Sequence, residues 1–231
     1  MIDIRIDGVL TGTPRAFGPD GRTSTIASRY PASGPVAVGP DGFAGDAVAD
    51  TRNHGGADKA VHHYPRDHYT AWVADLQPGA PTILGEVGAF GENISTSGIT
   101  EEDVCIGDCF RAGSALVQVS QARQPCWKLN VRFATPDMAK RVQTTGRTGW
   151  YYRVLDPGEI GLGDRLVLES RPQPEWSLAR ILHVLYHDTL NRDALAAIAG
   201  IPELADGWRR LAARRLETMK VEDWSARLQS A

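Results

Sequence analysis

The sequence has few cysteines and no long apolar run. Its 231 residues include only three cysteines, at positions 105, 109 and 126. Because three thiols cannot all pair within one chain, at least one is expected to be free. No window approaches the run of about 20 apolar residues that crosses a bilayer, and the N-terminal MIDIRIDGVL lacks the basic start and continuous apolar run of a signal peptide. We therefore expect a cytoplasmic protein with no membrane partner.

The excess of charge of either sign is also small. The formal net charge is -3, and 42% of the residues are hydrophobic while 23% are charged. These values are typical of a folded globular protein and give no general reason to expect a nucleic-acid partner.

Residues 1–170 have the pattern of a mainly β protein. Ile2, Ile4 and Ile6 fall on one face of an alternating run, and similar short runs follow between turns rich in Gly, Pro and Asp. Helices are expected at 65–76 and at 135–147, the second with Thr135 as its N-cap. Since these helices do not separate regular βαβ units, the pattern favours a barrel or sandwich.

Residues 171–231 change to a helical pattern. Pro172 and Pro174 form a stiff linker, after which three amphipathic segments follow. Ser177 and Asn191 are expected to cap the first two helices, and Gly200 to end the second. The sequence therefore predicts a barrel domain at 1–170 and a small three-helix domain at 171–231.

The densest polar cluster is DTRNHGGADKAVHHYPRDHY, residues 50–69. It contains His54, His62, His63 and His68, but the spacing H-x7-H-H-x4-H matches no zinc signature. The alternative is structural: a Gly-Gly turn, a packed His62, and His68 on an exposed helix face.

A second cluster, GAFGEN at 88–93, contains glycines that would let backbone amides approach an anionic ligand, although most such turns are only turns. Cys105 and Cys109, further along, have no C-x-x-C spacing and are expected to be small buried hydrophobic residues. The loop around Arg147, between Gly146 and Gly149, could supply an arginine to a phosphate. The alternative is a plain connection whose Trp150 and neighbours fill the barrel.

Cys126 differs from the other cysteines because of its setting. It follows an expected strand and Pro125, and it lies between Arg123 and Lys128, whose charges favour a thiolate. A thiolate can attack an electrophile or bind a soft metal. Residue chemistry alone leaves these uses and an inert buried thiol as alternatives.

Three motifs in this order resemble those of the MOSC family, the domain related to the C-terminal part of molybdenum cofactor sulfurases, and of its YiiM-type subgroup. They are HGGADKAVHHYPRDHY, the segment from GAFGEN through SQARQPCWKL, and TGWYYRVL. The resemblance continues through the C-terminal helices and covers nearly the whole chain. It implies a MOSC-type β-barrel with helical excursions and a small α-helical domain. Ala122 departs from the pattern, which has proline there, and this affects strand geometry more than chemistry.

The resemblance also implies a function. The family binds a molybdenum cofactor (molybdopterin) through a cysteine that falls on Cys126, and it reduces N-hydroxylated compounds, including purine bases, with electrons from a separate flavin or haem reductase. His54 and His62 are candidates for hydrogen bonds to the pterin or for proton delivery. The candidates for holding the cofactor's phosphate and pterin are Arg52, Lys59, Gly91, Asn93, Arg123 and Arg147.

Two other functions remain open from the sequence. Cys126 could carry a persulfide and transfer sulfur, or the protein could bind or store molybdenum cofactor for another protein. The C-terminal GWRRLAARRLE has basic residues, Arg209, Arg210, Arg214 and Arg215, that could meet an acidic flavoprotein or simply face solvent. A monomer and a homodimer are both compatible with the sequence.

Overall fold

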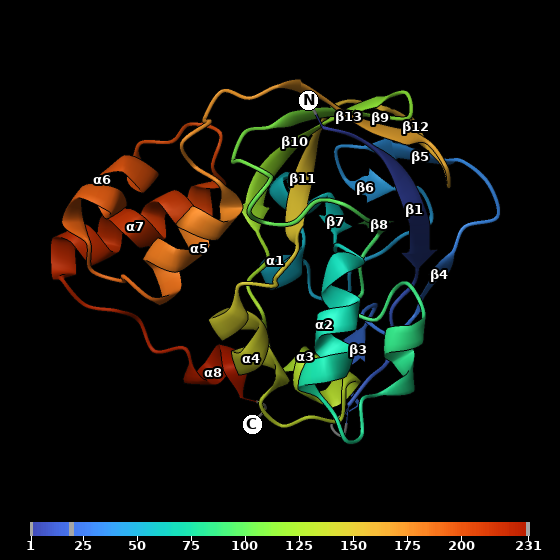
Figure 1. The fold of residues 1–231 in the computed structure, drawn as a ribbon, viewed down its shortest axis with the longest axis horizontal. Helices are drawn as coiled ribbons and strands as arrows, with labels where there is room; N and C mark the ends of the chain where they lie inside the picture. The colour runs from blue at the N-terminus through green and yellow to red at the C-terminus, as the bar shows by residue number, and fades with distance from the viewer. Residues whose placement is uncertain (1, 19–20, 230–231) are drawn as a thin grey trace.

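The protein consists of a β-barrel carrying short helices, with a group of helices at its side. The structure is a computed structural model that describes residues 2–18 and 21–229, apart from the side chains of Arg52 and Asn53. Figure 1 shows the strands on one side and the C-terminal helices, coloured orange to red, on the other. These helices are α5 (Leu178–Tyr186), α6 (Arg192–Ala199) and α7 (Asp206–Thr218).

The barrel closes through seven strands in the order β13-β9-β10-β11-β7-β8-β1, because β13 also pairs with β1. Neighbouring strands are antiparallel except β7 and β8, which are parallel. The bounds are β1 (Asp3–Gly12), β7 (Val61–His63), β8 (Ile94–Thr96), β9 (Cys109–Ala112), β10 (Ala115–Ala122), β11 (Trp150–Asp156) and β13 (Arg165–Ser170). The smaller strands are β2 (Arg15–Ala16), β3 (Thr23–Ser24), β4 (Arg29–Pro31), β5 (Val36–Gly39), β6 (Gly42–Phe43) and β12 (Gly158–Ile160). The predicted mainly β barrel is confirmed.

Alternating side chains fill the barrel, as the sequence pattern predicts. Trp150 and Tyr152 of β11 are fully buried. His63 of β7 lies with them, its Nδ1 2.9 Å from the Tyr152 hydroxyl and its Nε2 2.8 Å from Thr96 Oγ1. Burial lowers the pKa of His63 to about 3, so the ring stays neutral and serves the core. His63 is therefore a structural member of the His-rich segment.

Both helices expected within the barrel domain are present, as α2 (Asp67–Asp75) and α4 (Met138–Thr145). The N-cap prediction for α4 was wrong. Asp137 precedes the helix, and the Thr135 hydroxyl donates to Phe133 O instead. Asn130 Oδ1 accepts from the amide of Ala139 at 2.7 Å, so a side chain from outside the helix satisfies an amide in its first turn. The short helices α1 (Thr51–His54), α3 (Lys128–Arg132), η1 (Ala57–Lys59) and η2 (Thr82–Gly85) had not been expected.

Two side chains lie differently from the sequence expectation. His68, expected on an exposed helix face, is buried, with its Nε2 2.6 Å from a Glu101 carboxylate oxygen. Cys105 is buried as expected, whereas Cys109 is only half-buried. The helical period predicts which face of α2 carries His68. It does not show that the segment around Glu101 covers that face.

The C-terminal helices begin as predicted. Ser177 Oγ accepts from the amide of Arg180 at 3.2 Å, and Asn191 Oδ1 accepts from that of Ala194 at 3.0 Å. Arg215 does not belong to the expected basic face of α7, because its side chain is buried. A further short helix, α8 (Ser225–Leu228), follows. Within the described part of the chain, no helix has both the length and the apolar character needed to cross a membrane.

Candidate functional site

A cavity with two adjoining chambers lies among the His-rich segment, the GAFGEN turn and the loop after β10. The barrel chamber, of about 240 Å³, is bounded by His62, Gly91 and Arg123, among others. The tail chamber, of about 750 Å³, is bounded by Trp127 and by the C-terminal residues 226–227, among others. Among the described residues, seven line both chambers: Ala49, Asp50, His54, Lys59, Cys126, Lys128 and Tyr151. The thiol-bearing residue therefore belongs to the wall that the two chambers share.

Most of the site residues predicted from sequence meet in this cavity. Those that line the barrel chamber are His54, Lys59, His62, Gly91, Asn93, Arg123 and Cys126. The side chain of Arg52 lies outside the described part of the structure. Arg147 lies elsewhere: its Nη1 is 2.6 Å from Asp75 Oδ2 and its guanidinium is 4.9 Å from the ring of Trp72. This placement gives Arg147 no contact with the cavity.

Cys126 forms the end of a chain of three polar side chains. It follows β10 and precedes α3, so it lies in a loop that enters the cavity wall. Its Sγ is 3.6 Å from Nε2 of His54, which ends α1. The other ring nitrogen, Nδ1, is 3.2 Å from Asp50 Oδ2. The order is therefore thiol, imidazole, carboxylate.

The charge state of His54 decides what this chain can do. Burial, reinforced by the nearby charge of Lys128, lowers the pKa of His54 to about 4. The ring is therefore neutral at neutral pH and has one N–H. Because a carboxylate accepts but does not donate, we assign the proton to Nδ1, facing Asp50. His54 Nε2 then has a lone pair for the proton of the Cys126 thiol.

The GAFGEN turn does not offer its amides to a ligand, which agrees with the second alternative from the sequence, a plain turn. The buried carboxylate of Glu92 accepts from the amides of Gly88 at 2.7 Å and Phe90 at 3.1 Å, and from the Tyr69 hydroxyl. The amides of residues 89, 91 and 93 also have partners within the protein. The carboxylate of Glu92, within the same turn, therefore satisfies the amide donors that a ligand would need.

The carbonyl groups of the same turn instead orient side chains of the cavity. Phe90 O accepts from Arg123 Nη1 at 2.9 Å. Gly91 O lies 3.2 Å from His62 Nδ1 and also accepts from Arg29 Nη1. The turn is therefore a rigid acceptor that positions two guanidinium groups and an imidazole.

Sequence reasoning missed Arg29 and Asp46, which pair with each other and line the barrel chamber. Asp46 accepts from Arg29 Nε at 2.9 Å and from Asn93 Nδ2 at 3.1 Å. Asn93 Oδ1 accepts in turn from the amide of His62 at 3.0 Å. Asn93 thus braces the turn against β7. No periodicity or motif connects Arg29 to Asp46, so the sequence carries no local signal for this pair.

Arg123 is a buried cation without a carboxylate partner. Its exposed fraction is 7%, and no carboxylate of the described residues lies within ion-pair distance of its guanidinium. Lys128, at the same cavity, likewise makes no ion pair within the described residues. An uncompensated buried charge is costly. The cavity is therefore suited to an anionic ligand.

His62, which also lines the barrel chamber, is held as a neutral ring. Burial, reinforced by the charge of Arg123, lowers the pKa of His62 well below its ordinary value. The neutral ring donates from Nδ1 to Gly91 O, which leaves Nε2 with a lone pair and no partner in the described part of the chain. This nitrogen faces Gly149, where an added Cβ would lie 3.2 Å from it.

We expect Gly91→Ala to destabilise the protein by about 2–4 kcal/mol, because it combines backbone strain with a steric clash. Gly91 has a φ of 73°, and a Cβ there would lie 2.8 Å from Ile26 Cγ1 and 3.0 Å from Ile26 Cα. Gly146 has a φ of 71°, with no atom within 4 Å of the added Cβ, so Gly146→Ala isolates the backbone cost. Urea unfolding measures both. Equal losses would show that Ile26 moves aside without cost.

Comparisons with known proteins agree with this architecture. The model of the MOSC domain matches residues 50–167, and that of the YiiM-like, 3-alpha helix domain matches residues 176–218. Protein YiiM of Escherichia coli (strain K12) is 38% identical over 220 residues, which are 95% of this chain and 96% of that protein. A protein of Gibberella moniliformis named Reductase is 40% identical over 186 residues, which are 80% of this chain and 32% of that longer protein. The crystal structure of YiiM from Geobacillus stearothermophilus has a TM-score of 0.77 and 39% identity, covering 92% of this chain and 99% of that one.

Proposed function

The chain belongs to the MOSC-domain family, in its YiiM-like branch with a C-terminal three-helix domain, and from this premise we propose that it is a molybdenum-cofactor-dependent reductase of N-hydroxylated compounds. Cys126 is the proposed molybdenum ligand. One observation carries the proposal: the thiol lies on the wall of a chamber that is also lined by Arg123, a buried cation with no carboxylate partner among the described residues. A relative of this chain is named a reductase, which supports the reaction class.

The residues present fit the cofactor. Molybdopterin carries a phosphate, a pterin with N–H groups and a soft sulfur-bound metal. Arg123, with Lys59 and Lys128, would hold the phosphate. The Cys126 thiolate is the soft ligand that such a metal prefers.

When bound, the molybdenum centre supplies the two electrons that break the N–O bond of the substrate. The side chains of the protein manage protons and position. His54 Nε2 accepts a hydrogen bond from the Cys126 thiol, and Asp50 fixes the ring with its acceptor nitrogen toward the sulfur. The tail chamber, walled by Trp127 and Tyr151, is large enough for a purine base. The overall reaction consumes two electrons and two protons and releases water, with the electrons delivered by a separate reductase.

Sulfur transfer is the second candidate, and the Asp50–His54–Cys126 order favours it. A thiol beside a neutral imidazole, itself oriented by a carboxylate, is also the arrangement of a nucleophilic cysteine. Cys126 would then carry a persulfide rather than a metal. The two functions need the same residues. They differ in what is bound to the Cys126 sulfur, which is molybdenum in the first and a second sulfur atom in the other.

The test is reduction of N-hydroxyadenine by the cofactor-loaded protein with an artificial electron donor. We expect formation of adenine that depends on bound molybdenum, with cofactor-free protein as the control. Chromatography measures the product, and mass spectrometry of the Cys126 peptide measures persulfide. Full molybdenum occupancy without reduction would point to storage. A Cys126 persulfide in protein that holds no molybdenum would point to sulfur transfer.

A further inference from the structure

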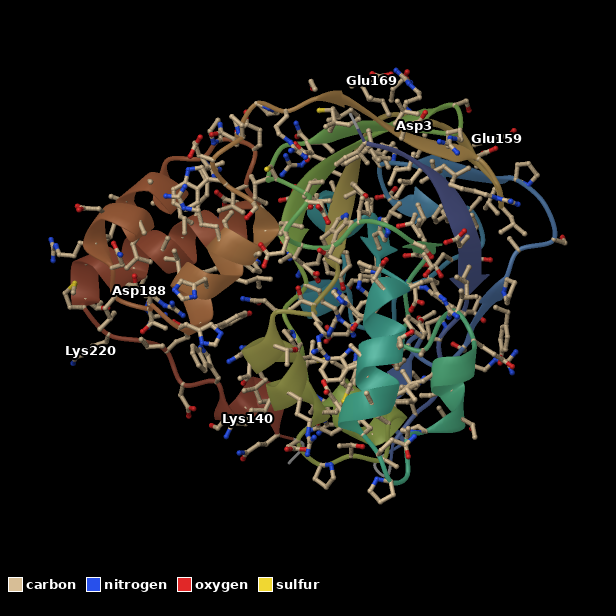
Figure 2. All side chains as sticks on the ribbon, in the orientation of Figure 1. Asp3, Lys140, Glu159, Glu169, Asp188 and Lys220 are labelled. Carbon is tan, nitrogen blue, oxygen red and sulfur yellow. The ribbon has the colours of Figure 1, made fainter. Side chains whose placement is uncertain are left out.

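The segment that follows the three C-terminal helices returns to the barrel. After α7 ends at Thr218, residues 219–229, here called the tail segment, lead to α8, which lies beside α4 rather than beside α5–α7 (Figure 1). In Figure 2, Lys220 marks the start of this segment and Lys140 marks α4, near which it ends. The model of the three-helix domain matches only as far as residue 218. The tail segment therefore extends beyond that domain and toward the cavity.

The first half of the tail segment is anchored to the three helices. Glu222 accepts from Nε of the buried Arg215 at 3.0 Å and from its Nη2 at 2.6 Å. Arg215 Nη1 also donates to Leu185 O of α5 at 2.8 Å. Trp224 donates from Nε1 to Glu222 at 2.7 Å, and its ring meets Tyr186 edge-on at 5.6 Å. These contacts fix the point from which the chain reaches the barrel.

The second half holds the residues on both sides of Cys126. Arg227 Nη1 donates to the carbonyl of Pro125, and the amide of Trp127 donates to the Arg227 carbonyl at 2.8 Å. Arg227 Nη2 also donates to the buried Gln143 of α4 at 2.6 Å. One residue of the tail segment thus bonds the backbone directly before and directly after the thiol.

The tail segment also forms a wall of the tail chamber. Ala226 and Arg227 line it together with Cys126 and Trp127. The small side chain of Ala226 leaves room in that wall. A larger side chain at position 226 would narrow the chamber without touching the bonds of Arg227.

We propose that the tail segment completes the active site, with Arg227 as a positioning residue for Cys126 and Ala226 as a determinant of which substrates fit. The three-helix domain then has a defined role, because it anchors the segment that holds the reactive loop. The inference rests on the proposed function only in taking Cys126 as the reactive thiol and the tail chamber as the place of its substrate.

The first experiment measures alkylation of all three thiols in the cofactor-free full chain, by iodoacetamide with peptide-resolved mass spectrometry. In Arg227→Ala we expect Cys126 to react about tenfold faster, because a charge-assisted hydrogen bond that closes the loop is lost. Cys109 of β9 reports on the barrel, and the buried Cys105 reports on the linker before α5. The alkylation rates of both thiols should stay unchanged. Arg227→Lys, which cannot reach both acceptors, should give an intermediate rate.

Arg214→Ala is the matched control, since Arg214 is an exposed arginine of α7 away from the cavity. A Cys126 rate in Arg227→Ala equal to that in Arg214→Ala would overturn the positioning role. A parallel rise at Cys105 and Cys109 would also overturn it, because general loosening would then explain the result.

The second experiment compares a small with a bulky thiol reagent on Ala226→Trp. We expect iodoacetamide to modify Cys126 as in the wild type and a fluorescein maleimide to react several times more slowly. Equal effects on both reagents would overturn the role of Ala226. These readouts need no molybdenum, so a wild-type protein that fails to reduce N-hydroxyadenine yet shows the expected alkylation pattern would refute the proposed function and leave the tail assignment standing.

Discussion

Replacing Cys126 by alanine is expected to remove molybdenum from the purified protein and to lower reduction of an N-hydroxylated base by more than about a hundredfold. Loss of a direct metal ligand lowers metal affinity and activity more than loss of a residue that only orients a ligand. All three cysteines lie in the described part of the chain, and of these only Cys126 lines the cavity. Elemental analysis of the metal and product chromatography measure the two effects.

Two variants make this experiment specific. Cys109→Ala removes a half-buried thiol whose Sγ lies 3.4 Å from Gly107 O, away from the cavity, and should keep both metal and activity. Cys126→Ser keeps the size of the side chain but replaces the soft sulfur by a hard oxygen, and should lose molybdenum as alanine does. Full molybdenum in Cys126→Ala would refute the ligand assignment.

The sequence predicts the barrel strands and the C-terminal helices because their signals are local. The alternation in β1 and the caps Ser177 and Asn191 each act within a few residues. Closure of the barrel by β13 on β1 depends on pairing between residues such as Asp3 and Val167, for which a single sequence contains no signal. The helices α1, α3 and α8 span four or five residues, too few for a helical period to be visible.

The candidate site is only partly predictable for a related reason. Cys126 and His54 are suggested by residue chemistry and by the family resemblance, and the structure places them 3.6 Å apart. Whether a turn presents amides or carbonyls depends on which groups are already satisfied. Glu92 satisfies two amides of the GAFGEN turn, and the carbonyl groups of Phe90 and Gly91 contact side chains of the cavity instead. Arg123 and Arg147 were both candidates from the sequence, Arg147 the weaker one, and only Arg147 has a carboxylate partner among the described residues.

This difference between the two arginines gives the second large expected effect. We expect Arg123→Met to weaken cofactor retention about a hundredfold, because two charge-assisted hydrogen bonds to a phosphate are worth about 3 kcal/mol or more. The free energy of unfolding without cofactor should change by less than about 1 kcal/mol. Removal of a buried unpaired charge stabilises the fold, whereas Phe90 O loses its donor, and these two changes oppose each other. Molybdenum content after loading and urea unfolding measure the two quantities.

Arg147→Met is the matched control. It removes the same charge from the chain but breaks an ion pair with Asp75 that is partly exposed on both sides and worth no more than about 1 kcal/mol. Arg147→Met should therefore retain molybdenum at the wild-type level. Equal loss of molybdenum in both variants would mean that overall charge, rather than the buried guanidinium of Arg123, attracts the cofactor. Full retention in Arg123→Met would remove the phosphate role from Arg123 and leave Lys59 and Lys128, on the wall shared by the two chambers, to carry it.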